Sequence, residues 1–157
     1  MVVLDYFSLE EFDSPDQKGS GANMNPDFLA MLEYAREKAG IPFVITSGYR
    51  TPAHNRKVGG VTNSAHTKGR AADIRYQTEK DAEKIIRAAL DAGFKRIGIG
   101  NRFIHLDNDF TLPTPAIWKY QNTPNSLWKK YQNAFKKRSN LLQVLALVVV
   151  GYWLMKG

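Results

Sequence analysis

The chain has 157 residues, which allows one domain with a hydrophobic core plus an appendage and excludes two ordinary domains. It contains no cysteine, so a disulfide framework and a thiolate metal site are excluded, and a bound metal would need His, Asp or Glu ligands. The net charge is +7, but residues 1–113 carry 15 basic and 15 acidic side chains, and the whole excess lies in residues 114–157. This distribution argues against a nucleic-acid-binding face and for a basic appendage that seeks an anionic surface.

The first half of the chain predicts a helix, a strand and a long loop. Asn25-Pro26 is a typical helix start and Gly40 a typical stop, which predicts a helix over 26–39. A short buried strand is predicted over 42–46. Residues 49–70 are rich in Gly, Asn, Ser, Thr and His and show no apolar period. A loop of this length in a compact domain is usually functional, so we expect the chemistry there.

The following segments predict the rest of one domain. They indicate a strand over 71–76, a helix over 78–92, and a hairpin formed by 96–99 and 103–107. Helices mixed with short, turn-linked strands, without βαβ alternation, predict an α+β fold with a mainly antiparallel sheet. Because two prolines follow and acidic residues vanish, we expect the domain to comprise residues 1–113.

Two of the three histidines lie in contexts that suit a metal. His66 is separated from Asp73 by a segment that contains Gly69, and His105 lies on a predicted strand. Two imidazoles and one carboxylate suit zinc and leave a fourth position for water, as in hydrolytic sites. The spacing alone leaves a structural role open for each histidine, and His54 is interpreted as a structural or surface residue.

Longer motifs resemble a known family. They are TSGYRTP over 46–52, SAHTKGRAAD over 64–73 and FIHLD over 103–107. Together they closely resemble the zinc D-Ala-D-Ala carboxypeptidase family, which includes phage endolysin L-Ala-D-Glu peptidases and is related in fold to the hedgehog signalling domain. The resemblance covers about residues 5–110 and implies a D,D-peptidase-like fold.

The resemblance also implies roles for individual residues. It makes His66, Asp73 and His105 the ligands of Zn²⁺. It makes Arg50, with help from Ser64 and Tyr49, the group that holds a substrate carboxylate or polarises the peptide carbonyl. The planar fork of donors on arginine suits either task, whereas lysine could not imitate it.

One feature departs from the family pattern. Many relatives place a general base two or three residues before the last zinc histidine, where this chain has Arg102 and Phe103. Asp107 lies on the same strand face as His105 and is the nearest carboxylate. Two roles remain open for Asp107, the catalytic base and the partner that orients a ligand imidazole.

The C-terminal part predicts attachment to a membrane. We expect a basic aromatic linker or amphipathic helix over 114–140 and an apolar, membrane-seeking segment over 141–157. The apolar run Leu141–Met155 would span about 22 Å as a helix, less than the roughly 30 Å of a bilayer core. A helix packed in the domain and a protein anchor are the alternatives.

These observations predict zinc-dependent hydrolysis of a peptide bond in peptidoglycan, by a carboxypeptidase or an endopeptidase. The alternative is a non-catalytic protein that binds the cell wall or builds a membrane or virion structure. The N-terminus lacks the features of a signal peptide, while the positive-inside rule would keep a membrane-spanning form in the cytoplasm. A phage lysis or virion-associated enzyme would resolve this conflict, with the protein at the virion or host envelope.

Overall fold

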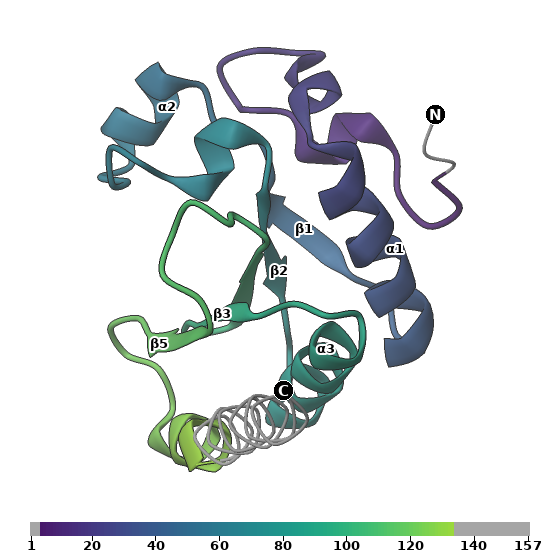
Figure 1. Ribbon diagram of the computed structural model, residues 1–157, viewed down its shortest axis with the longest axis vertical. Helices are drawn as coiled ribbons and strands as arrows, with labels where there is room; N and C mark the ends of the chain where they lie inside the picture. Colours follow the sequence, from purple (N-terminus) through teal and green to yellow (C-terminus); the bar gives the residue numbers. More distant parts are fainter. Residues whose placement is uncertain (1–3, 134–157) are drawn as a thin grey trace, which may run out of the picture. The chain divides into compact units, whose positions relative to one another are not determined.

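The computed structural model describes residues 4–133. The chain divides into two compact units, Met1–Thr123 and Pro124–Gly157. The first unit contains the labelled helices and strands of Figure 1, and in the second unit the described residues 125–133 are helical. Within the described part of the chain, no helix is both long and apolar enough to cross a membrane.

The predicted elements are present in the expected order, except that the short strand predicted as buried over 42–46 lies over 44–47 and its side chains are half-buried or exposed. In chain order the described elements are η1 (Leu9–Phe12), η2 (Ser20–Asn23), α1 (Pro26–Ala39), β1 (Val44–Ser47), α2 (Pro52–Lys57), η3 (Ala65–Lys68), β2 (Ala71–Arg75), α3 (Glu79–Asp91), β3 (Arg96–Ile99), β4 (Phe103–Asp107) and β5 (Ala116–Lys119), where η denotes a 3-10 helix. α1 has the predicted ends, because Asn25 Oδ1 accepts a hydrogen bond from the Phe28 N–H at 3.1 Å and Gly40 adopts a left-handed conformation.

The strands pair in the order β1-β2-β4-β3-β5. All neighbours are antiparallel except β3 and β5, which run parallel. β3 and β4 form the hairpin that the sequence predicts, with its turn after Ile99. The α+β fold with a mainly antiparallel sheet is therefore confirmed.

The hydrophobic core lies between one face of the sheet and the helices α1 and α3, which lie side by side in Figure 1. Ile74, Ile97 and Ile104 supply this face from β2, β3 and β4, and each is fully buried. Successive side chains of a strand point to opposite faces, so on each strand the residues next to these isoleucines in the sequence face away from the helices. The sheet thus leaves one face for polar chemistry.

The predicted loop over 49–70 is more ordered than its composition suggests. It contains the short helix α2 and the 3-10 turn η3. Thr51 caps α2, because its Oγ1 accepts a hydrogen bond from the His54 N–H at 3.0 Å, and Pro52 occupies the first helical position. A helix of six residues is too short for an apolar period to be visible in the sequence.

The sheet continues beyond the domain end that composition predicts. β5 follows residue 113 and pairs with β3, and the compact unit extends to Thr123. The predicted linker or amphipathic helix over 114–140 therefore begins with a strand and becomes helical from residue 125. The predicted membrane-seeking segment 141–157 lies outside the described residues and stays a prediction.

Gly69 closes the turn between η3 and β2. Its φ is +65°, and a Cβ atom there would lie 2.1 Å from the carbonyl oxygen of Asn23. The Gly69 carbonyl accepts a hydrogen bond from the Asn25 N–H at 2.8 Å. A side chain at Gly69 is thus excluded by the backbone conformation and by the segment that precedes α1.

We expect Gly69→Ala to destabilise the fold more than Gly40→Ala. Gly40 has a similar φ of +62° but open space around it. Its substitution should therefore lower the free energy of unfolding only by the strain of a left-handed conformation, about 1–2 kcal/mol. Any further decrease in the free energy of unfolding of Gly69→Ala measures the steric clash with the Asn23 carbonyl. Urea unfolding of both variants measures the difference, and equal losses would contradict the role of close packing.

Candidate metal centre

The strand register places one residue of each strand in a single row across the sheet, and this row contains two of the predicted metal ligands. Ser47 pairs with Asp73, Asp73 with His105, His105 with Gly98, and Gly98 with Trp118, across all the strands of the sheet. Paired residues share a face, and this row lies on the face opposite the buried isoleucines. Two of the three predicted metal ligands are therefore direct cross-strand neighbours.

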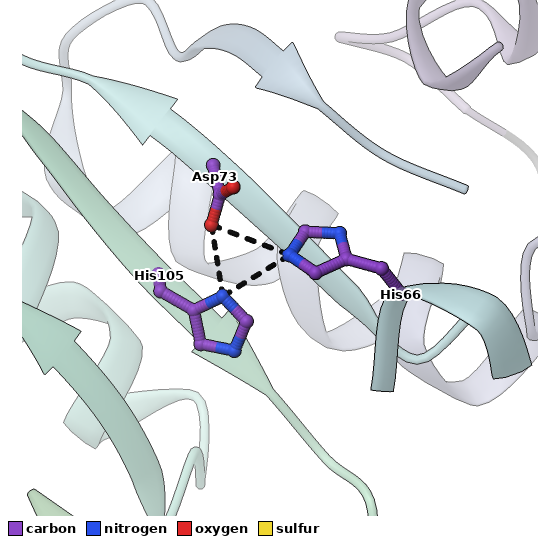
Figure 2. A group of neighbouring side chains, drawn as sticks. All are labelled: His66, Asp73 and His105. Carbon is purple, nitrogen blue, oxygen red and sulfur yellow. Dashed lines mark hydrogen bonds and ion pairs between the residues drawn. The ribbon is translucent and has the colours of Figure 1, made fainter. Parts of the chain in front are cut away.

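His66 reaches the same point from η3 (Figure 2). Its Nδ1 lies 2.7 Å from the Gly48 carbonyl oxygen, which can only accept a hydrogen bond, so Nδ1 carries the proton. The unprotonated Nε2 then points at His105 Nδ1, at 3.2 Å, and at Asp73 Oδ1, at 3.4 Å. His66 is buried and is thereby held as a neutral imidazole with its lone pair toward the other two residues.

His105 is oriented in the same way by a carboxylate. Its Nε2 donates to Asp107 Oδ2 at 3.1 Å. Its Nδ1 faces Asp73 Oδ1 at 2.8 Å, as Figure 2 shows. When an outer partner accepts a hydrogen bond from the N–H of one ring nitrogen, the lone pair of the other nitrogen is free to bind a metal.

The three inner atoms fit a zinc ion. Zinc in a tetrahedral site lies about 2.0–2.1 Å from each N or O ligand, which separates the ligand atoms by about 3.3 Å. The observed separations between His66 Nε2, His105 Nδ1 and Asp73 Oδ1 are 2.8–3.4 Å. All three are acceptors that converge on one point, so a cation there, either a proton on His105 or a metal ion, satisfies them together.

Burial and hydrogen bonding set the charges of this group. Burial raises the pKa of Asp73, but the neighbouring imidazoles of His105 and His66 outweigh this effect and lower the pKa below its ordinary value, so the carboxylate is ionised. Burial lowers the pKa of His66 and favours its neutral form. Burial also lowers the pKa of His105, but hydrogen bonds with Asp107 and Asp73 raise it overall.

Arg50 lies beside the ligand set, as the sequence predicts. Its Nη2 donates to Asp73 Oδ2 at 2.7 Å, and its Nε donates to Ser47 Oγ at 2.7 Å. Within residues 4–133, Nη1 hydrogen bonds to no protein group, and the side chain is 17 % exposed. Arg50 therefore steadies the second oxygen of Asp73 and keeps its Nη1 group for another molecule.

Asp107 is engaged on both oxygens and is almost fully buried. Oδ2 accepts from His105, and Oδ1 accepts from Arg96 Nε at 2.7 Å and from the Asp109 N–H at 3.1 Å. A carboxylate held by these donors is poorly placed to take a proton from a water molecule. The contacts favour the second predicted role for Asp107, which is to orient His105.

A cleft of about 430 Å³ opens over the ligand set. Its wall includes the predicted Arg50, Ser64 and Asp107, whereas Tyr49 is not among the lining residues. His54, interpreted as a structural or surface residue, lines a smaller cavity that shares Arg50 with the cleft. Reasoning from the sequence missed further lining residues, among them Arg96, Phe103, Trp118 and Tyr120. Phe103 shares a strand face with His105 by alternation along β4. The others reach this face only through strand pairing, which the sequence does not reveal.

The comparisons with known proteins agree with the motifs. The sequence matches the family model for Peptidase M15 over residues 5–107. The chain belongs to the peptidase M15 family. This membership confirms the family resemblance and makes the chain a member of a peptidase family, and the matched segment ends at Asp107, before β5.

Among solved structures, this M15 chain is similar to the Serratia marcescens L-Ala D-Glu endopeptidase ChiX. The identity is 20 % and the TM-score 0.43, over 57 % of this chain and 84 % of that chain. The search of curated proteins gave no match.

We expect the full chain to bind one zinc ion through His66, Asp73 and His105. His66→Ala should abolish tight binding, because it removes one of three converging ligands. His54→Ala is the matched control and should bind zinc as the wild type does. Metal analysis after dialysis checks this, and one tightly held zinc in His66→Ala would refute the ligand set.

Asp107→Asn separates the two roles of that residue. If Asp107 orients His105, the substitution should weaken zinc binding about 10–100-fold, because a neutral amide accepts the hydrogen bond of the imidazole N–H more weakly than a carboxylate does. Asp91→Asn, at an exposed position at the end of α3, should leave affinity unchanged. Competition against a chromophoric chelator measures both, and unchanged affinity with lost turnover would instead indicate a catalytic base.

Proposed function

We propose that this M15 peptidase hydrolyses a peptide bond in peptidoglycan stem peptides with the help of zinc. The observation that carries the proposal is the buried group of His66, Asp73 and His105, whose acceptor atoms converge beneath an open cleft. The choice of substrate rests on the resemblance of segments 46–52 and 64–73 to the D-Ala-D-Ala carboxypeptidases.

The side chains around the centre support hydrolysis of a carbonyl compound. Bound zinc supplies a Lewis acid that activates water and polarises a carbonyl. Arg50 is fixed by Ser47 and Asp73, so its Nη1 group has a defined direction before substrate arrives. A fixed donor beside the carbonyl stabilises the charge that develops on its oxygen, because no reorganisation is needed during the reaction.

One observation favours a second candidate, a wall-binding protein without catalysis. Among the described residues that line the cleft, Asp73 and Asp107 are the only carboxylates, and both are held by hydrogen bonds within the protein. A peptidase of this design must take the proton of the attacking water without a free carboxylate in this part of the chain. A binding protein needs no such group.

Digestion of purified peptidoglycan decides between the two candidates. The zinc-loaded full chain should release fragments whose masses identify the bond, since a carboxypeptidase removes a terminal residue and an endopeptidase leaves longer peptides. His105→Ala, which lacks a ligand, is the inactive control. Co-sedimentation with peptidoglycan without any released fragment would favour the binding protein. If the chain neither releases fragments nor co-sediments with peptidoglycan, both candidates are contradicted.

Arg50→Lys should lower kcat/KM about 10²-fold or more, because lysine cannot keep the contact to Asp73 and also direct a donor at the substrate. Zinc content should be retained, since the three ligands remain. Arg75→Lys, an exposed arginine at the end of β2, is the matched control and should keep full activity. Unimpaired turnover in Arg50→Lys would refute the role of Arg50.

A further inference from the structure

An aromatic pair borders the cleft on the side of β5. Trp118 lies on β5, and Tyr120 follows it and continues the pairing, since its N–H donates to the Ile99 carbonyl at 2.9 Å. Both side chains line the cleft. They lie beyond the segment that matches the family model, so nothing in that match assigns them a role. We call this pair the aromatic wall.

Gly98 makes room for the aromatic wall. It stands between His105 and Trp118 in the cross-strand row. A Cβ atom at Gly98 would lie 2.7 Å from the Tyr120 ring and 2.8 Å from the Trp118 indole. The two rings therefore lie directly over the glycine and lean toward the metal centre, instead of being held off by a side chain.

The aromatic wall is close enough to the metal centre to contact a bound substrate. The Trp118 ring lies 5.4 Å from the His105 ring, and the Tyr120 ring lies 6.4 Å from it. Phe103 packs against Tyr120 at 5.0 Å and supports it from β4. A group bound at the centre would therefore lie within a side chain's length of both rings.

The cleft is lined by both apolar and polar side chains. Val61 and Leu112 line it together with the aromatic wall and Phe103. Arg50, Asn63 and Ser64 supply polar groups to the same cleft. A peptide bound in this cleft would therefore contact both kinds of group, and the aromatic wall is the part of the lining that suits an apolar side chain.

The geometry of the wall selects the kind of group it can take. The Trp118 and Tyr120 rings are inclined by 60° with centroids 6.2 Å apart, so they form a corner rather than a flat platform. The Arg96 guanidinium lies over the Trp118 ring at 5.3 Å. A flat sugar ring needs an open aromatic face, whereas a compact alkyl side chain fits a corner and gains from the removal of apolar surface from water.

We propose that Trp118 and Tyr120 form a specificity subsite that takes a small alkyl side chain of the peptide, next to the bond at the metal centre. The proposal rests on the proposed function for the identity of the bond. It makes β5 the strand that selects substrate, whereas β2 and β4 carry metal ligands.

The test uses the zinc-loaded full chain and stem-peptide analogues that change one residue at a time on either side of the cleaved bond. At one of these positions, wild type should prefer alanine over serine about 10-fold or more in kcat/KM. Trp118→Ala and Tyr120→Ala should raise KM for the alanine peptide and bring the preference close to one, with zinc affinity unchanged. Tyr120→Phe keeps the ring and should keep the preference.

Lys119→Ala is the matched control, because Lys119 lies on the same segment but points to the opposite face. Gly98→Ala should act like the wall variants by displacing both rings. A preference for alanine that persists in Trp118→Ala and Tyr120→Ala, or its absence in wild type, would overturn the proposal.

Calorimetric binding of the same peptides separates this proposal from the proposed function. If wild type cleaves none of them but binds the alanine peptide more tightly, and the wall variants lose that difference, the subsite stands while the peptidase proposal fails. If wild type neither cleaves nor binds them selectively, the subsite proposal fails as well.

Discussion

The convergence of three acceptor atoms on one buried point is the interaction on which the rest of the site depends. His66 Nε2, His105 Nδ1 and Asp73 Oδ1 lie 2.8–3.4 Å apart, and such a group is stable only with a cation between its members. Each member is held from behind by a partner of its own. Gly48 orients His66, Asp107 orients His105, and Arg50 holds the second oxygen of Asp73. The inner set is thus rigid because its outer hydrogen bonds are satisfied.

The antiparallel register supplies the geometry of this group. Asp73 and His105 are cross-strand partners on the neighbouring strands β2 and β4, and both side chains face away from the helices. A slip of one residue between β2 and β4 would turn one ligand into the core and expose an isoleucine. The hydrophobic packing of α1 and α3 on the other face therefore also maintains the metal ligands, because it penalises that slip.

Two arginines connect the centre to the cleft. Arg50 contacts Asp73 and Arg96 contacts Asp107, so the charge of each carboxylate is balanced by a guanidinium. Arg96 also lies over Trp118 and thereby links the support of His105 to the aromatic wall. The support of the metal ligands and the substrate-facing surface are consequently built from side chains on neighbouring strands.

The sequence by itself determined the features that depend on neighbouring residues. These include the caps of α1, the hairpin of β3 and β4, the α+β class, and the candidate ligands His66, Asp73 and His105, whose motif is local and specific. The tertiary structure alone decided which distant residues meet. The partners of Asp107, the approach of Trp118 over Gly98 and the continuation of the domain through β5 all follow from strand pairing. Pairing depends on the packing of the whole sheet against α1 and α3, and the composition of a four-residue strand after two prolines does not encode its parallel partner.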